Sequence, residues 1–172
     1  MRKILGLAIV ALLTFSFSGV KAQNYKFGHI NSQEILKAMP DRDSAEAKIK
    51  KYAESLQDQI EQLQVEFNKK YQDYLQKRAT FTDAIREMKE KELTDMQQRA
   101  QEYQQVAEQD YQRYQAETMK PVIDKADAAI KKVAKANGFT YIFDTSSGVL
   151  LYFSEQSIDI TPLVKKELGI TK

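Results

Sequence analysis

The sequence predicts an α+β protein in which a small body carries one long helical arm. In the middle of the chain, apolar residues recur at gaps of three and four over two stretches without Gly or Pro, which indicates two long helices. Aromatic and β-branched runs, typical of strands, occur only near the two ends. We therefore expect a discontinuous body, residues 23–42 plus 120–172, and an arm of residues 43–119.

Residues 1–22 have the pattern of a signal peptide. Arg2 and Lys3 precede an apolar run, and small residues follow that run up to Ala22. The run is shorter than the ~20 residues that a membrane span needs, which argues against the alternative of an uncleaved membrane anchor. We expect an exported protein that is cleaved between Ala22 and Gln23.

Composition and charge favour neither catalysis nor nucleic-acid binding. The chain has no cysteine, which excludes disulfides and thiolate metal sites, and its one histidine, His29, lies in a predicted strand where a structural role is expected. The residues for a nucleophile–base pair and for a glycine-rich phosphate loop are missing. Acidic and basic residues alternate without a basic stripe, so no nucleic-acid partner is expected. We therefore expect a protein that is not an enzyme and that takes no metal or cofactor.

The arm is predicted to be two antiparallel helices that fold back at residues 79–83. Thr80 or Thr82 is placed to cap the second helix, and Asp83 suits its first turn. At ~1.5 Å per residue the first helix would be roughly 55 Å long, with a thin seam and no globular core. The predicted seam residues are Ile49, Ala53, Leu56, Ile60, Leu63, Phe67, Tyr71 and Tyr74, facing Ile85, Met88, Met96, Ala100, Tyr103, Ala107, Tyr111 and Tyr114.

One seam position of the second helix is polar, because Glu92 falls between Met88 and Met96. Glu92 belongs to a group of glutamates, a residue type that can bind a cation. Basic residues interleave with these glutamates on the helix, so salt-bridged, solvated side chains are expected instead. The group consists of Glu87, Glu90 and Glu92 with Arg86, Lys89 and Lys91.

The body is predicted from both ends of the exported chain. A short strand over residues 25–30 is followed by a turn of helix, which Asn31 or Ser32 caps and Pro40 ends. Pro121 cannot donate a backbone hydrogen bond, so we expect it to kink or restart the second arm helix and to act as a hinge. Beyond it, an apolar stripe runs to Asn137-Gly138, a typical helix end.

Residues 139–143 and 149–153 are predicted to form a β-hairpin around a Ser/Gly turn, followed by a last helix near Pro162. The second run is apolar on both faces, so it does not fit a sheet that has one solvent-exposed face, where apolar and polar residues alternate. The body has only about 73 residues, which is small for an independent core. We therefore expect neighbouring subunits to cover this hairpin. In a single chain, either Val149, Leu151 and Phe153 or the opposite pair, Leu150 and Tyr152, should be exposed.

The order strand, short helix, long helical excursion, then "PVIDKADAAIKKVAKANGFTYIFDTSSGVLLYF" and "DITPLVKKEL", resembles the Skp or OmpH-like family of periplasmic chaperones. The resemblance covers essentially the whole exported chain. It implies a homotrimer whose small β-barrel body carries three helical arms around a cavity. In that cavity, unfolded outer-membrane β-barrel proteins are held without ATP in the periplasm. One departure is the charge of the arm: over residues 41–120, acidic residues outnumber basic ones by three.

Two groups of site residues follow from these interpretations. The candidates for the trimer interface or body core are Phe27, Ile30, Phe139, Tyr141, Ile142, Phe143, Val149, Leu150, Leu151, Tyr152 and Phe153. The candidates for client contact, which can equally be seam residues, are Tyr52, Phe67, Tyr71, Tyr74, Phe81, Met88, Met96, Tyr103, Tyr111 and Tyr114. A structural or adaptor coiled-coil protein of the envelope is the alternative function, and peripheral association with a membrane is left open.

Overall fold

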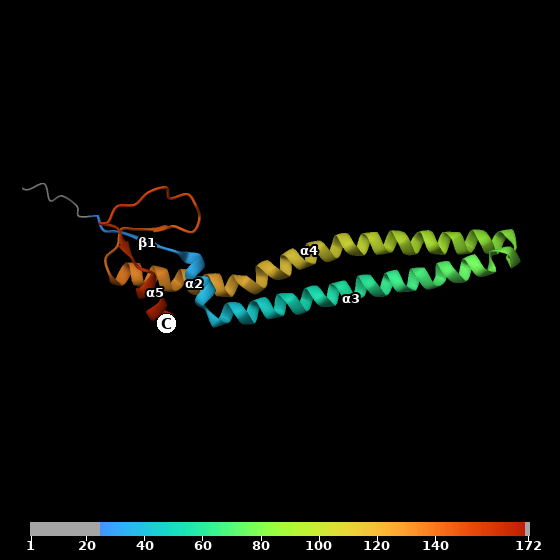
Figure 1. Cartoon of the computed structure of the whole chain (residues 1–172), viewed down its shortest axis with the longest axis horizontal. Coiled ribbons are helices and arrows are strands. Elements are labelled where there is room, and N and C mark those ends of the chain that lie inside the picture. The colour runs from blue at the N-terminus through green and yellow to red at the C-terminus, as the bar shows by residue number, and fades with distance from the viewer. Residues whose placement is uncertain (1–24, 171–172) are drawn as a thin grey trace, which may run out of the picture.

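The computed structural model describes residues 25–170, so the predicted signal peptide and its cleavage site lie outside the described residues. The elements along the chain are β1 (Phe27–Ile30), α2 (Ser32–Ala38), α3 (Pro40–Lys77), the 3-10 helix η1 (Arg78–Thr80), α4 (Asp83–Ala136), β2 (Tyr141–Asp144), β3 (Ile158–Asp159) and α5 (Thr161–Glu167). Figure 1 shows a small mixed body at one end and a long two-helix arm that projects from it. This architecture confirms the predicted α+β class.

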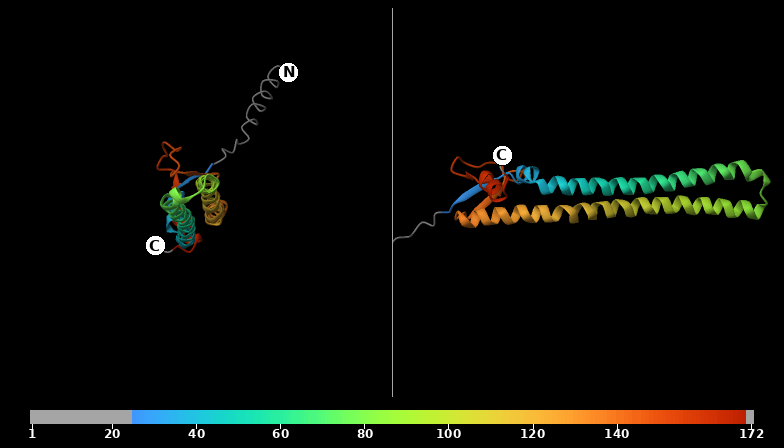
Figure 2. Two further views of the ribbon diagram at one scale, coloured as in Figure 1. Left: turned by 90° about the vertical axis from the view of Figure 1, so that its right-hand side faces the viewer. Right: turned by 90° about the horizontal axis from the view of Figure 1, so that it is seen from below.

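The arm is a single antiparallel helical hairpin. Its helices α3 and α4 have 38 and 54 residues, and the views of Figures 1 and 2 show them side by side as far as the tip. At the tip, the side chain of Thr82 accepts a hydrogen bond from the backbone N–H of Ile85 (3.4 Å), which caps α4. The predicted fold-back point is therefore confirmed, with Thr82 rather than Thr80 as the cap.

Pro40 follows the end of α2, as predicted, and also begins α3, because a helix loses no hydrogen bond when proline stands in its first turn. Of the two outcomes expected at Pro121, a kink or a restart, the restart is wrong, because α4 continues from Asp83 to Ala136. Pro121 is exposed, so water can satisfy the carbonyl that loses its helical partner. In Figure 1 the axis of α4 changes direction gradually where the arm meets the body.

The sheet has three strands in the order β2-β1-β3, and both pairings are parallel. Phe27 pairs with Tyr141 and Gly28 with Ile142 on one side, while Gly28 also pairs with Ile158 on the other. The long excursion through α2, α3 and α4 is the crossover connection that a parallel β1–β2 pair requires.

The predicted hairpin is therefore wrong. Residues 141–144 do form a strand, but residues 149–153 form none, and the chain beyond the turn leaves the sheet. In this chain β2 pairs with β1, and among the described residues the other edge of β2 carries no strand. The turn itself is anchored to the end of β1, because the N–H of Thr145 donates to the carbonyl of Ile30 (2.8 Å).

The core of the body lies between the sheet and the helices α2, α5 and the last four turns of α4. Successive side chains of a strand point to opposite faces, so Gly28, Ile30 and Ile142 face this helical layer. The core residues are Ile30, Ile35, Met39, Ala45, Val122, Ala126, Ala129, Val133, Ile160 and Val164. Ala45 lies on α3, so the base of the arm belongs to the core as well.

The helices α4 and α5 end in the same way. After α4, Gly138 has φ +67°, and the N–H of Phe139 donates to the carbonyl of Ala134 (3.0 Å). After α5, Gly169 has φ +71°, and the N–H of Ile170 donates to the carbonyl of Lys165 (2.9 Å). A glycine with positive φ just past the helix allows these bonds to form, which turns Phe139 back toward the sheet.

Gly28→Ala is expected to lower the free energy of unfolding by about 1–3 kcal/mol. A methyl group on Gly28 would lie 2.8 Å from Cδ1 of Ile142, 2.9 Å from Cε1 of Phe139 and 3.1 Å from the carbonyl oxygen of Ile158. Urea denaturation followed by circular dichroism measures the effect. Lys131→Ala, at an exposed position of α4, is the control and should change stability by less than about 0.5 kcal/mol. A Gly28→Ala protein as stable as the wild type would contradict this account of the sheet packing.

Candidate functional site: the outer sheet face and the arm

The face of the sheet that points away from the helices is aromatic. The ring centroids of Phe27 and Tyr141 lie 6.1 Å apart, those of Phe27 and Phe143 6.3 Å, and those of Tyr25 and Phe27 6.3 Å. These four side chains are between 41 and 57% exposed. Such rings bury a large area when covered, so this outer sheet face is an unfilled contact surface.

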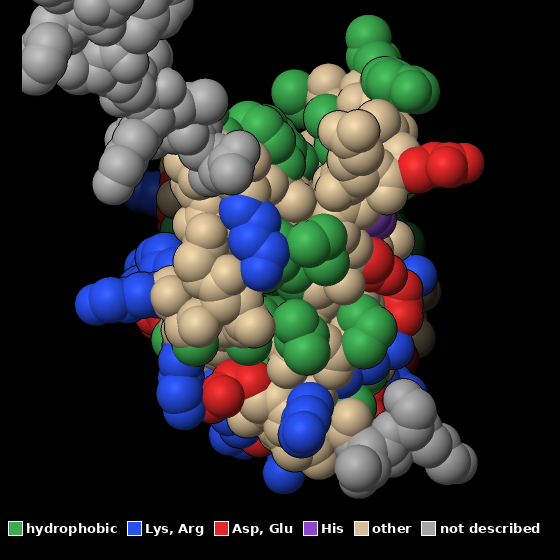
Figure 3. Space-filling view, turned by 90° about the vertical axis from the view of Figure 1, so that its left-hand side faces the viewer, with side chains coloured by type: hydrophobic (Ala, Val, Ile, Leu, Met, Phe, Trp, Pro, Cys, Tyr) green, Lys and Arg blue, Asp and Glu red, His purple; other side chains and the backbone are tan. Residues whose placement is uncertain are grey.

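The segment of residues 149–153 continues this apolar surface. Leu151 is 94% exposed, Val149 83% and Tyr152 80%, whereas Leu150 is half-buried. The first of the two expected sets, Val149, Leu151 and Phe153, is therefore confirmed as exposed, and Tyr152 of the other set is exposed as well. Figure 3 shows groups of hydrophobic side chains on the end of the body, between basic and acidic residues.

His29 connects the loop after β2, which includes residues 149–153, to the sheet. Its ring stacks on Phe153, with centroids 4.1 Å apart, and its Nδ1 lies 2.9 Å from Oγ of Ser157. Both contacts are structural, in keeping with the role expected for a histidine in a strand. Beside the loop, β2 and β3 form the two edges of the sheet, where backbone groups can extend the ladder to a further strand.

A carboxylate at the end of β2 fixes the turn that leads into this loop. Asp144 accepts hydrogen bonds from Oγ of Ser32 (2.5 Å), from the backbone N–H of Ser32 (3.2 Å) and from the N–H and hydroxyl of Ser146 (2.9 and 2.8 Å). Burial opposes ionisation of Asp144, but these hydrogen bonds outweigh it and lower the pKa of the carboxyl. The charged Asp144 thus connects the start of α2 to the turn after β2.

The inner half of the arm is held by aromatic and apolar side chains. The rings of Tyr52 and Tyr114 stack across the two helices with centroids 4.2 Å apart, and Ile49 and Ala107 are buried nearby. Further out, the hydroxyl of Tyr103 donates to Oε1 of Gln59 (2.5 Å). Several tyrosines of the arm are thus seam residues that join α3 to α4.

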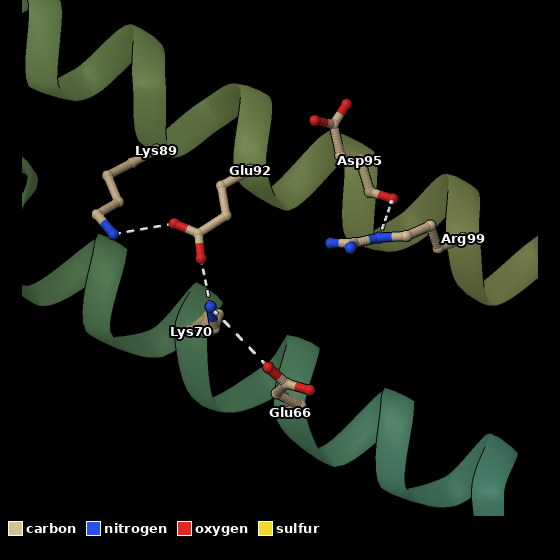
Figure 4. Close-up of polar contacts among 6 residues, drawn as sticks. All are labelled: Glu66, Lys70, Lys89, Glu92, Asp95 and Arg99. Carbon is tan, nitrogen blue, oxygen red and sulfur yellow. Dashed lines mark hydrogen bonds and ion pairs between the residues drawn. The ribbon is translucent and has the colours of Figure 1, made fainter.

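The outer part of the arm is joined differently. Figure 4 shows Glu92 of α4 between Lys89 of the same helix and Lys70 of α3. Hydrogen bonds from Lys70 and Lys89 lower the pKa of Glu92 to about 2, and the hydrogen bond to Glu92 raises the pKa of Lys70. Closer to the tip, the hydroxyl of the buried Tyr74 donates to Glu90, which raises the pKa of the tyrosine.

The family model for outer membrane proteins of the OmpH-like type matches residues 26–168. The chain belongs to the OmpH-like family. A crystal structure of a proposed outer membrane chaperone (OmpH-like) from Caulobacter crescentus CB15 has the same fold, with a TM-score of 0.72 and 14% sequence identity over 88% of this chain and 89% of that chain. No curated protein sequence matches the chain.

In this OmpH-like chain, the body candidates fall into two sets. Ile30 is buried in the core, and Phe139 and Ile142 pack against it from the sheet side. The others lie on the outer sheet face or in the loop beyond it. These are Phe27, Tyr141, Phe143, Val149, Leu150, Leu151, Tyr152 and Phe153. Apart from Phe153, which stacks on His29, and Leu150, which is half-buried, the second set has no such role within this chain, whereas the first set packs in its core.

The arm candidates of the OmpH-like chain divide in the same way. Tyr74 and Met96 are buried in the seam, and Tyr52, Phe67, Phe81, Tyr103, Tyr111 and Tyr114 are half-buried. Tyr71 and Met88 are instead 41 and 57% exposed, and so is Ile85 at 40%, so the seam prediction is wrong at these three positions. The half-buried positions of α4 at this level are instead Arg86, Lys89, Glu92 and Leu93.

Exposed apolar residues that the sequence interpretation missed also lie on the arm. They are Val65, Leu75 and Val106. Each is an apolar residue outside the heptad-like series, and that departure from the pattern is the signal that could have found them. Within residues 25–170, no side chains cluster in a way that could hold a metal ion, and none of the helices combines the length and apolar character that crossing a membrane requires.

Proposed function

We propose that this OmpH-like protein is a homotrimeric, ATP-independent holdase chaperone, which keeps unfolded outer-membrane proteins from aggregating between its arms. The observation that carries the proposal is the combination of an aromatic, uncovered sheet face on a small body with a long projecting arm whose exposed side chains include Tyr71, Leu75 and Met88. Family membership and the fold shared with a proposed outer membrane chaperone support a chaperone role.

In this proposal, residues 23–42 plus 120–172 form the trimerisation body. Three chains bring three outer sheet faces together, and the edges β2 and β3 extend into a small barrel. The run of residues 149–153 becomes a strand when it pairs with a neighbouring chain, which buries Leu151 and Tyr152. This assembly covers the surface that a single chain leaves open.

The arms of residues 43–119 surround the space in which a client is held. Unfolded β-barrel proteins expose many short apolar segments, which adaptable Tyr and Met side chains can contact without a fixed geometry. We assign this role first to the exposed Tyr71 and Met88, since the buried candidates hold the hairpin together. The pattern of residues 1–22 supports export to the periplasm, where such clients pass.

An aggregation assay tests the proposed function. Several unrelated outer-membrane β-barrel proteins are diluted from urea with and without the mature protein, and their light scattering is followed. A holdase suppresses aggregation of all of them in the absence of ATP. A structural or adaptor protein of the envelope, which recognises one folded partner, would leave every client to aggregate.

Client affinity is expected to change less than tenfold between ~0.05 and ~0.5 M NaCl. The arm carries a small excess of acidic residues, so it offers no long-range attraction to an acidic client. Apolar and aromatic contacts are not weakened by screening, although local charges can still influence the association rate. Fluorescence anisotropy of a labelled unfolded barrel protein measures the affinity. A loss greater than tenfold, about 1.4 kcal/mol, would mean that charge pairing retains the client.

A further inference from the structure

The seam of the arm has a charged break in its outer part. Proceeding outward along α3, apolar side chains reach into the interface as far as Phe67, and Met96 is buried opposite them on α4. At the next level, the half-buried positions on α4 are Lys89, Glu92 and Leu93, so that Leu93 is the one apolar side chain among them. Beyond the break, Tyr74 and Phe81 form an aromatic contact again, with ring centroids 6.3 Å apart.

One ion pair spans this break. Nζ of Lys70 on α3 donates to Oε1 of Glu92 on α4, and Oε2 of the same carboxylate accepts from Lys89 (2.9 Å). Glu66 lies one turn from Lys70 on α3, with its Oε1 3.9 Å from Nζ of Lys70. Arg99, the next cation along α4, donates to the backbone carbonyl of Asp95 instead of joining the pair. Within this group, only Lys70–Glu92 connects the two helices.

Packing is loose around the pair. A groove of about 660 Å³ runs beside it, lined by charged side chains together with Tyr74, Phe81 and Leu93. Close to this level, Nε of Arg86 is buried without a hydrogen-bond partner among the described residues, although its other nitrogens contact Asp83 and the carbonyl of Phe81. The helices are therefore joined at this level mainly by polar contacts, with Leu93 half-buried beside them and the Tyr74–Glu90 hydrogen bond closer to the tip.

We propose that the Lys70–Glu92 pair is an electrostatic latch that closes this break, and that its release lets α3 and α4 separate there so that the end of the arm bends relative to the base. The base keeps its shape because the Tyr52–Tyr114 stack and the buried Ile49 and Ala107 hold it. The inference concerns the arm alone and does not depend on the proposed function.

Salt, and not mild acid, should release the latch. The side chains of Lys70 and Glu92 are 42 and 31% exposed, so dissolved ions can screen the pair. The pKa of Glu92 is lowered from its usual 4.5 to about 2, first by Lys70 and then by Lys89. A lowered pKa means that the stabilisation is complete above the usual value and is lost as the pH falls from about 4.5 toward about 2. The latch therefore stays charged between pH 7 and pH 5.

The test measures the separation of the helices in the full mature protein without any client. The chain has no native cysteine, so nitroxide spin labels can be attached to Gln72→Cys and Lys91→Cys at the level of the latch, or to Ser55→Cys and Gln109→Cys near the base. All four positions are exposed. Labelled chains are diluted into an excess of unlabelled chains, so that pulsed electron paramagnetic resonance reports distances within one chain.

Lys70→Gln removes the only contact of this group that crosses the arm, and it leaves helix propensity almost unchanged. Lys70→Gln should raise, about two- to fivefold, the fraction of chains in which the distance between the spin labels at the level of the latch is longer and more broadly distributed. In the wild type, 0.5 M NaCl should have the same effect. Lys89→Gln is the matched control, because it removes only a contact within α4, and Lys70→Arg keeps the crossing charge. Both should resemble the wild type, and the base distance should not change in any variant. An unchanged distribution for Lys70→Gln, or an equal effect of Lys89→Gln, would overturn the latch.

Discussion

Leu151→Asp is expected to dissociate the proposed trimer while each chain keeps its fold. Leu151 is 94% exposed in the single chain, so the substitution removes no contact that the chain makes by itself. In a trimer the same side chain would be buried, and the loss of a buried leucine costs about 1.5–3 kcal/mol per chain. Summed over three chains, association should weaken at least a thousandfold, because each tenfold step corresponds to about 1.4 kcal/mol.

Static light scattering at micromolar concentration, with circular dichroism to confirm the helix content, measures this result. Ser154→Asp introduces the same charge at a neighbouring exposed position that is already polar, and it should remain trimeric. A trimeric Leu151→Asp protein would show that residues 149–153 do not form the interface. A wild-type protein that is a stable monomer under these conditions would refute the trimer itself.

Removing the arm is expected to abolish holdase activity and to leave the body folded and trimeric. Ala45 on α3 belongs to the core and Met119 on α4 packs against it, so the cut must lie further out than residues 43–119. A short Gly/Ser linker in place of residues 54–112 retains both residues and the Tyr52–Tyr114 stack, which holds the two cut ends together. With no arm to surround a client, suppression of aggregation should fall at least tenfold.

The aggregation assay and light scattering together separate the two functions of the chain. A second variant, in which a linker replaces residues 68–94, shortens the arm to its apolar base and should retain intermediate activity. If the variant without residues 54–112 failed to assemble, the division into body and arm would be wrong. If it assembled and still suppressed aggregation, the clients would be held by the body.

The sequence by itself determined the local features of this protein. Heptad-like spacing without Gly or Pro predicted both arm helices, and the turn chemistry around Thr82 and Asp83 predicted where they fold back. The sequence also predicted Asn31 as a candidate cap of α2 and Gly138 as the residue after α4, because caps and helix ends depend on neighbouring residues. The apolar character of residues 149–153 on both faces also predicted their exposure in a single chain.

Only the tertiary structure decided which strands pair and which side chains the arm leaves free. Two apolar runs around a turn favour a hairpin, yet β2 pairs in parallel with β1, which lies more than a hundred residues earlier in the chain. Heptad spacing also placed Tyr71 and Met88 in the seam, whereas both are exposed and the half-buried positions of α4 there are Lys89, Glu92 and Leu93. Strand pairing and the seam of a long hairpin depend on contacts between residues far apart in sequence. A local sequence pattern does not determine which of several compatible strands or side chains pairs at a given position.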